Sequence, residues 1–206
     1  MIFQQIPLGL LRANTYLLAD TESREGVVID VGGDSKLLLE KIRKEDIQIQ
    51  KILLTHGHLD HILGANETKF ALGATMYLHY EDRELFRDSK LRNFFGPSAV
   101  DHLDVDVFLE DGQVIIFGKH HLKVIHTPGH TQGSVCFLLD DQILFSGDTL
   151  FYQNIGRTDH RGGDTEQEIR SIKKYLLDLS ENIKVYPGHG RSTDIGHERK
   201  HNPFLQ

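Results

Sequence analysis

Four short apolar segments of this chain are each followed closely by a histidine or an aspartate that stands beside a glycine or a proline. The segments span residues 51–54, 124–127, 143–146 and 183–186, and His56, His130, Asp148 and His189 follow them. Apolar runs of this length, bounded by glycine or proline, predict buried strands. Glycine permits tight backbone geometry at the strand ends. The pattern favours a fold in which several strand ends bring metal-binding residue types together.

The densest of these segments is residues 55–61, which read Thr-His-Gly-His-Leu-Asp-His and contain His56, His58, Asp60 and His61. Imidazole and carboxylate groups suit borderline divalent metals. Ligands on an extended loop, followed by an Asp-His pair on a turn, can face two different points, which favours two ions over one. The alternatives are a histidine-rich surface loop and, for His130 or His189 alone, a buried structural histidine. The four strand ends taken together favour a metal site.

Length and composition fit one domain over residues 1–206 with a sizeable core. The formal charge of −7 argues against nucleic-acid binding, which needs a basic patch. A single cysteine, Cys136, lies in an apolar run and is expected to pack in the core rather than act as a nucleophile. No secretory signal or membrane-length apolar stretch is present, so we expect a cytoplasmic protein with no membrane partner. The sequence does not indicate an oligomeric state.

The spacing of apolar residues predicts two β-rich halves, each with helices. The expected elements are a meander of strands over 2–6, 14–19 and 26–31, a helix capped by Asp34-Ser35, a helix over 62–72, an irregular stretch over 88–106, hairpins within 114–125 and 135–145, and a helix opened by a capping box of Thr165 and Glu168. Two sheets packed face to face with helices outside would suit this order, although periodicity alone does not distinguish it from other α/β arrangements.

The order His-x-His-x-Asp-His, His, Asp, His resembles the metallo-β-lactamase superfamily, in particular its short glyoxalase II-like branch. The short sequence motifs that flank these residues also resemble those of hydroxyacylglutathione hydrolase-like members. They are Thr-Pro-Gly-His-Thr at 127–131, Ser-Gly-Asp-Thr-Leu-Phe at 146–151, Gly-Arg-Thr-Asp at 156–159, Pro-Gly-His-Gly at 187–190 and Asn-Pro-Phe-Leu at 202–205. The resemblance covers nearly the whole chain and implies an αββα sandwich of two mixed β-sheets with helices on the outer faces.

The resemblance also implies a ligand set and a reaction. His56, His58 and His130 would hold a first metal, Asp60, His61 and His189 a second, and Asp148 would bridge them. Zinc is the first choice, and iron or manganese suit the same ligands. The implied activity is hydrolysis of a small thioester such as S-2-hydroxyacylglutathione by a hydroxide that bridges the metals, with Asp60 and Asp148 serving catalysis as well as metal binding. A thiolate leaves with little proton assistance, whereas an amide nitrogen needs a proton.

The chain departs from full-length glyoxalase II in two places. Only 17 residues follow His189, where full-length members carry a helical domain with basic glutathione contacts. Ile-Gly-Arg-Thr-Asp at 155–159 stands where they have Cys-Gly-Lys-Phe-Tyr. The resemblance therefore does not extend to the parts that contact glutathione in full-length members. Arg157 would either pair with a substrate carboxylate or anchor its own loop through Asp159 or Asp164.

Two rival functions remain open at this point. The Gly-Arg-Thr-Asp word is shared with iron-dependent persulfide dioxygenases of the same superfamily, which would use His56, His130 and Asp148 around one iron. A non-catalytic metal-binding module is the other rival, and it is disfavoured because all seven ligand positions are intact. His126 and Tyr152 stand near the ligands in sequence, and we expect His126 to be a strand residue first.

Overall fold

The computed structural model describes the backbone of residues 1–206 and the side chains of residues 1–89, 92–97 and 99–206. The chain divides into two compact units. The first unit contains residues 1–109 and 116–120, and the second contains residues 110–115 and 121–206.

The first unit contains a six-stranded sheet of order β1-β2-β3-β4-β5-β6. Its strands are β1 (Ile2–Leu8), β2 (Ala13–Ala19), β3 (Glu25–Ile29), β4 (Gln48–Leu53), β5 (Thr75–His79) and β6 (Val107–Leu109). The pairs from β1 to β3 are antiparallel, as the predicted meander requires. The pairs from β3 to β6 are parallel, so β3, β4 and β5 end at the same edge of the sheet.

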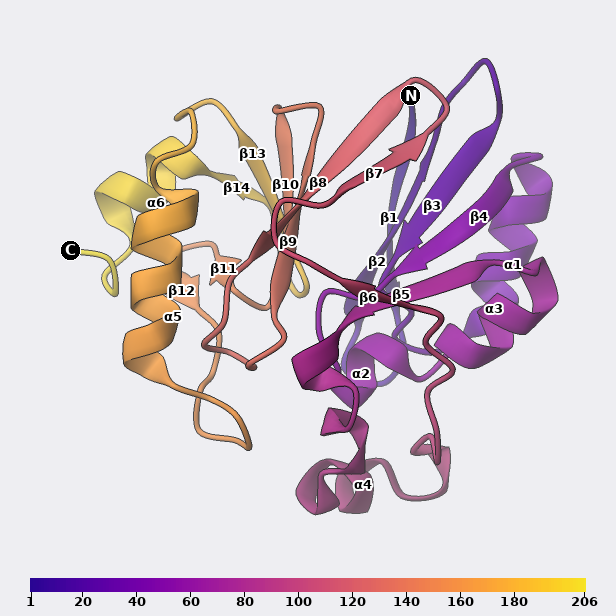
Figure 1. Ribbon diagram of the computed structural model, residues 1–206, viewed down its shortest axis with the longest axis horizontal. Coiled ribbons are helices and arrows are strands. Elements are labelled where there is room, and N and C mark those ends of the chain that lie inside the picture. The colour runs from indigo at the N-terminus through magenta and orange to yellow at the C-terminus, as the bar shows by residue number, and fades with distance from the viewer. The chain divides into compact units, whose positions relative to one another are not determined.

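Helices α1 (Ser35–Lys44) and α3 (Ala65–Leu72) cover one face of this sheet (Figure 1). Leu38 and Ile42 of α1 and Ala65 of α3 are buried in one apolar cluster with Ile52 and Met76 of the strands. The remaining helical segments are α2 (Leu59–Ile62), the 3₁₀ turns η1 (Tyr80–Asp82), η2 (Leu85–Arg87) and η3 (Gly96–Ser98), and α4 (Ser89–Phe95). The helix predicted over 62–72 is interrupted at Gly64, and the stretch predicted to be irregular contains α4.

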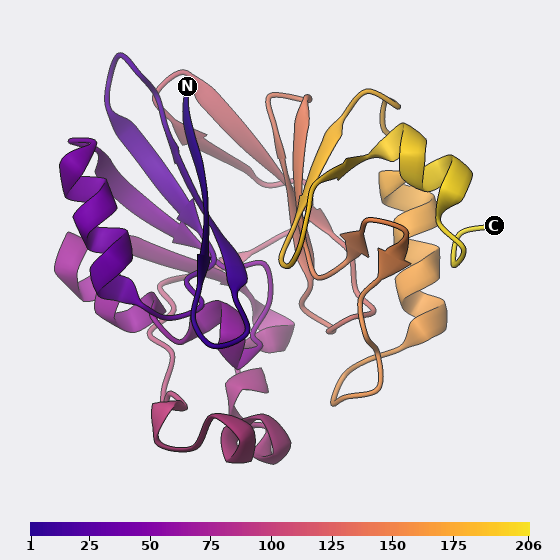
Figure 2. The same ribbon diagram turned by 180° about the vertical axis from the view of Figure 1, so that it is seen from behind.

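The second six-stranded sheet has the order β14-β13-β10-β9-β8-β7, and its residues belong to the second unit except for 116, 117 and 120. Its strands are β7 (Val114–Phe117), β8 (His120–His126), β9 (Val135–Leu139), β10 (Ile143–Gly147), β13 (Lys184–Pro187) and β14 (Thr193–Asp194), and a separate hairpin is formed by β11 (Leu150–Phe151) and β12 (Asn154–Ile155). Strands β10 and β13 are parallel neighbours, so both end at one edge of the sheet. The β13–β14 hairpin follows at the yellow-orange end of the chain in Figure 2.

Two helical segments cover one face of this second sheet (Figure 1). Helix α5 (Thr165–Ser171) continues into the π-helical turn η4 (Ile172–Leu176), and α6 (Ile195–His201) follows β14. Ile172, Leu176 and Ile195 form one buried cluster with Cys136 and Val185 of the strands. The cysteine is therefore a core residue, and burial raises the pKa of its thiol to about 12.

The prediction of a mixed α/β fold with two mixed sheets and accompanying helices is confirmed. Each unit has an apolar cluster of its own, as expected for the two β-rich halves. The assignment of residues 1–206 to a single domain stays a prediction. Within the described part of the chain, no helix combines the length and the apolar character that a bilayer span requires.

Candidate metal centre

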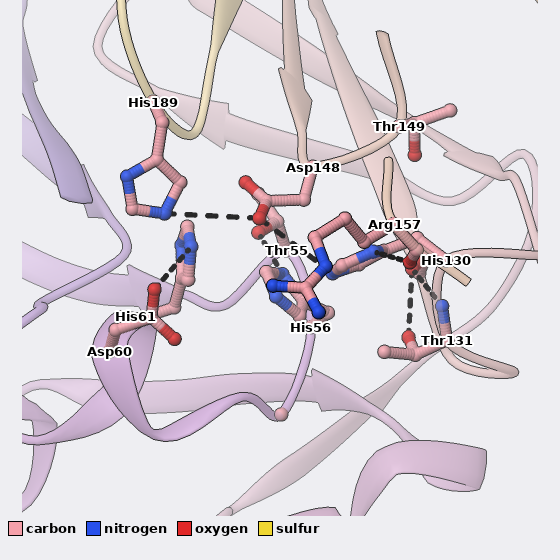
Figure 3. Close-up of polar contacts among 12 residues, drawn as sticks. Thr55, His56, Asp60, His61, His130, Thr131, Asp148, Thr149, Arg157 and His189 are labelled. Atoms are coloured by element: carbon pink, nitrogen blue, oxygen red, sulfur yellow. Dashed lines mark hydrogen bonds and ion pairs between the residues drawn. The ribbon is translucent and has the colours of Figure 1, made fainter. Parts of the chain in front are cut away.

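The first cluster of candidate ligands lies in the first unit, where β4 ends. His56 and His58 follow the strand on an extended loop, and Asp60 and His61 occupy the short helix α2. The ring centroid of His56 lies 4.8 Å from that of His58 and 4.3 Å from that of His61. Asp60 Oδ2 lies 3.7 Å from His61 Nε2 (Figure 3). One strand end therefore brings together all four candidates of the first unit.

Asp30 supports this cluster from the end of the neighbouring strand β3. Its carboxylate accepts hydrogen bonds from Thr55 N at 2.8 Å and Thr55 Oγ1 at 2.7 Å, and lies 2.8 Å from His61 Nδ1. The residue is buried, and its φ of 55° places it in the left-handed region, which is uncommon for a residue other than glycine. Three contacts to one buried carboxylate fix the positions of the loop and of His61.

His56 and His61 have the hydrogen bonds typical of metal-ligating histidines. His61 Nδ1 contacts Asp30, and His56 Nδ1 lies 3.0 Å from Thr55 Oγ1. A ligating histidine usually donates its second ring N–H to a carboxylate, hydroxyl or carbonyl, which directs the other nitrogen to the ion. Asp30, His56 and His61 present ligand-type atoms within 4.8 Å of one another. We assign Asp30 to the supporting role, because its carboxylate is already engaged by Thr55 and His61.

The second cluster lies in the second unit, at the edge where β10 and β13 end. Asp148 follows β10, His189 follows β13 and His130 follows β8. Asp148 Oδ2 lies 3.7 Å from His130 Nε2 and 3.8 Å from His189 Nε2 (Figure 3). These distances exceed those of hydrogen bonds. Two ligand atoms that share a tetrahedral ion lie about 3.4 Å apart, so the three residues fit metal ligation through Asp148.

His130 is held by two groups that are distant in sequence. Its Nδ1 lies 2.8 Å from the carbonyl oxygen of Arg157, and its backbone N–H donates to Glu168 Oε2. Gly156 is required here because a Cβ at this position would lie 2.1 Å from the Asp148 carbonyl oxygen. The Gly-Arg word at 156–157 thus contributes a close backbone approach and a carbonyl that orients His130.

Glu168 is a fully buried carboxyl on α5. Its burial raises the pKa of the carboxyl to about 9, although the hydrogen bond from His130 N lowers it. The prediction that Glu168 forms a capping box with Thr165 is wrong. Asp164 is the N-cap residue of α5 and accepts from Gln167 N at 2.9 Å. Glu168 points instead to the loop of His130.

The Arg157 side chain is paired within its own loop. Its Nε and Nη2 donate to Asp159 Oδ1 and Oδ2 at 3.0 and 2.8 Å, and both side chains are exposed. The bidentate bond from Arg157 lowers the pKa of Asp159 to about 2. Of the two roles predicted for Arg157, this geometry matches loop anchoring.

The structure also accounts for His126 and for residues that sequence reasoning missed. His126 lies in β8, as predicted, and its Nε2 contacts Gln132 O at 2.9 Å. Asp30 and Glu168 support the two ligand clusters, and neither was a candidate. Asp30 had a visible signal, because Val-Val-Ile-Asp at 27–30 is another apolar run that ends on an aspartate before glycines.

Several known proteins are similar to this chain over nearly its full length. Residues 8–189 match the family model described as "Metallo-beta-lactamase superfamily". The protein named "Hydroxyacylglutathione hydrolase GloC" from Haemophilus influenzae is 35% identical over 209 residues, covering 100% of this chain and 98% of that protein.

Three solved structures extend the comparison. The BLEG-1 B3 metallo-beta-lactamase is 38% identical with a TM-score of 0.90, and the match covers 99% of both chains. TTHA1623 in a di-iron-bound form is 35% identical with a TM-score of 0.87, over 98% of this chain and 100% of that one. ETHE1 from Myxococcus xanthus is 29% identical with a TM-score of 0.84, over 98% of this chain and 84% of that one.

Proposed function

Because this chain belongs to the metallo-beta-lactamase superfamily, we propose that its two ligand clusters together bind two divalent metal ions. His56, His58 and His130 would hold one ion, and Asp60, His61 and His189 the other. Asp148 would contact both. The observation that carries the proposal is the position of Asp148 Oδ2 at 3.7 and 3.8 Å from two imidazole nitrogens. The supporting contacts of His56, His61 and His130 agree with it.

Zinc is the first choice for both ions, since a shell of imidazole and carboxylate without thiolate suits it. The same shell accepts iron or manganese. The similarity to TTHA1623, which was solved in a di-iron-bound form, supports iron as the main competitor.

The proposed reaction is hydrolysis of a small thioester such as S-2-hydroxyacylglutathione. Divalent ions, when bound, lower the pKa of water toward neutrality and polarise a carbonyl group. The chain would orient the ligands of these ions through Asp30, Arg157 O and Glu168, which contact His61 and His130. A thiolate needs little proton assistance to leave, so the reaction does not require a separate general acid. The similarity to a hydroxyacylglutathione hydrolase over the full length supports this substrate class.

The second candidate function is an iron-dependent persulfide dioxygenase that uses His56, His130 and Asp148. The Gly-Arg-Thr-Asp word at 156–159 and the similarity to ETHE1 favour it. We rank it below the hydrolase because Asp60, His61 and His189 would form a second ligand set that this reaction does not use.

One pair of assays separates the two functions. The zinc-loaded protein is tested for cleavage of S-lactoylglutathione, and the iron-loaded protein for oxygen uptake with glutathione persulfide. We expect thioester cleavage with about two metal equivalents by elemental analysis, and loss of cleavage in Asp148→Ala. Oxygen uptake without thioester cleavage would replace the hydrolase by the dioxygenase. A stable maximum of one metal equivalent would contradict the two-ion site.

A further inference from the structure

The loops that carry Asp148 and His189 continue into a polar pocket within the second unit. The pocket has a volume of about 370 Å³, and its lining includes Tyr152, Lys184, Tyr186, Arg191, Asp194 and His197. Tyr152 stands four residues after Asp148, in the turn of the β11–β12 hairpin. Arg191 stands two residues after His189, in the loop between β13 and β14. Two residues span at most about 7 Å, so the pocket begins close to His189.

Arg191 differs from the arginines that are paired with acids in this unit. Arg157 pairs with Asp159, Arg170 with Glu166 and Arg199 with Glu181. The structure gives Arg191 no ion pair with any described side chain, and its guanidinium carbon lies 3.4 Å from the centroid of the Tyr152 ring. Stacking on an aromatic ring holds a guanidinium in place while its N–H groups stay available at the edge.

The Tyr152 ring stacks in turn on His197 of α6, and the His201 ring packs against His197 at an interplanar angle of 45°. The ring of His197 lies 4.9 Å from that of Tyr152 with an interplanar angle of 18°, and the ring of His201 lies 4.8 Å from that of His197. Gln153 Nε2 contacts both Tyr152 Oη at 3.2 Å and His197 Nε2 at 3.1 Å. The support of Arg191 is therefore built from α6 and the β11–β12 hairpin, which restricts its orientation.

The charges around the pocket favour an anion. Lys184 and Arg191 are the cationic side chains, and Asp194 is the acidic one. Asp194 is already engaged, because its Oδ2 accepts from Lys184 Nζ at 3.0 Å and its Oδ1 accepts from His197 N at 2.8 Å. Arg191 thus supplies a positive charge without a matching acid in a chain whose formal charge is −7.

We propose that this pocket is an oxyanion subsite in which Arg191, stacked on Tyr152, binds a carboxylate or phosphate group of the thiol carrier in the substrate. A guanidinium matches either group with two parallel hydrogen bonds. Arg157, for which pairing with a substrate carboxylate was one of two predicted roles, is occupied by Asp159. The assignment of the anion to a thiol carrier rests on the proposed thioester hydrolysis. The proposal that the pocket binds an anion does not depend on that reaction.

The loop geometry explains how one short segment serves two purposes. Residues 188–192 connect β13 and β14, and Gly190 has a φ of 73°, a conformation that favours glycine. In an extended chain the side chains of His189 and Arg191 would lie on the same face. The turn at Gly190 removes that constraint. A carrier anchored at Arg191 would thus be positioned by the same loop that carries a metal ligand.

Binding of inert analogues to the zinc-loaded full chain tests the subsite. Calorimetry is performed with S-methylglutathione, which carries carboxylates, and with desulfo-coenzyme A, which carries phosphates. We expect wild-type protein to bind at least one of them, and the tighter ligand identifies the source of the oxyanion. Arg191→Ala should weaken that binding by about 10- to 100-fold. Arg191→Lys should weaken the binding less than Arg191→Ala, because lysine keeps the positive charge. It should still weaken it, because an ammonium group cannot make the two parallel hydrogen bonds of a guanidinium.

Two controls complete the experiment. Arg170→Ala removes an exposed arginine of the same unit that pairs with Glu166, and it should bind the analogues as wild type does. The NMR signals of the His197 ring should shift when the analogue binds to wild type but not to Arg191→Ala. Equal affinity of wild type and Arg191→Ala for both analogues would overturn the proposal, as would no binding of either analogue to wild type.

The outcome is independent of the test of the proposed function. Anion binding that depends on Arg191 in a protein that cleaves no thioester would retain the subsite and reject the hydrolase. Cleavage of S-lactoylglutathione with analogue binding unaffected by Arg191→Ala would retain the hydrolase and reject the subsite.

Discussion

At the residue scale, Asp30 sets the chemistry of the first ligand cluster. Its carboxylate accepts from Thr55 and His61, so the proton of the His61 ring belongs on Nδ1 and Nε2 is available to an ion. An amide at this position presents a donor to at least one of these partners. The contact between Asp30 and His61 therefore decides the tautomer as well as the position of the ring.

We expect Asp30→Asn to lower metal affinity by about 10- to 100-fold while the fold is retained. The amide would donate to His61 Nδ1 and move the ring proton to Nε2, which would disable the ligand. Zinc competition with a chromophoric chelator measures the affinity. Asp46→Asn is the matched control, since Asp46 also has a positive φ, of 52°, and is exposed. Unchanged affinity in Asp30→Asn would remove Asp30 from the supporting role.

The sequence revealed residue types at strand ends better than it revealed their partners. His56, Asp148 and His189 stand beside glycine or proline after apolar runs, and these signals are local. The partner of His130 on α5 lies 38 positions away. Such a contact depends on how the helix packs on the sheet, so no local spacing indicates it. Glu168 was consequently assigned to a helix cap that Asp164 forms.

At the element scale, α5 is tied to the loop of His130 through Glu168. In the metal-free protein the carboxyl is protonated at neutral pH, because burial raises its pKa to about 9. Glu168→Gln should therefore leave the free energy of unfolding nearly unchanged at pH 7. Glu168→Ala should lower it by about 1–3 kcal/mol, since the buried N–H of His130 loses its acceptor. Urea unfolding of both variants measures the difference, and equal losses would contradict the neutral carboxyl.

The end of β2 gives a prediction about acid stability. Asp20 accepts from the N–H groups of Glu22, Ser23 and Lys119 at 2.6, 3.0 and 3.3 Å. Hydrogen bonds from Ser23 and Glu22 lower the pKa of Asp20 from 3.8 to about 2. A depressed pKa means that the stabilisation is complete above pH 4 and is lost as the pH falls through 2.

Asp20→Asn should therefore unfold more easily than wild type at pH 7, and the difference should shrink between pH 4 and pH 2. Urea unfolding at several pH values measures it. Asp141→Asn changes an exposed aspartate of a turn and should show no such pH-dependent difference. A constant gap between Asp20→Asn and wild type across this range would contradict the titration of Asp20.

At the scale of the whole molecule, the spacing of apolar residues predicted two β-rich halves, and the structure has two mixed six-stranded sheets. The strands were predictable because fully buried runs such as Val135–Leu139 are continuous and apolar. Helix α4 was not, because its residues, Ser-Lys-Leu-Arg-Asn-Phe-Phe, show weak helical periodicity. The packing of the sheets was expected from the family resemblance alone.

Metal removal should destabilise the whole chain, since the proposed ions bind the folded state. The expected loss is about 3–4 kcal/mol for each ion when free metal had been at 100 to 1,000 times its Kd. Thermal unfolding with and without a chelator, followed by addition of zinc, measures it. Asp148→Ala should lose the zinc response, whereas His121→Ala, an exposed histidine beside Asp140, should keep it. A melting temperature unaffected by zinc in wild type would contradict the proposed site.

The protonated Glu168 also makes the net charge of the folded protein at pH 7 less negative than the formal value. The formal value of −7 assigns a negative charge to every carboxylate. With a pKa of about 9, one of these groups contributes nothing to the mobility of the native metal-free protein at pH 7. Unfolding exposes the group and releases its proton at that pH. The net charge of the unfolded chain is therefore more negative by one because of Glu168, and folding takes up a proton from the buffer.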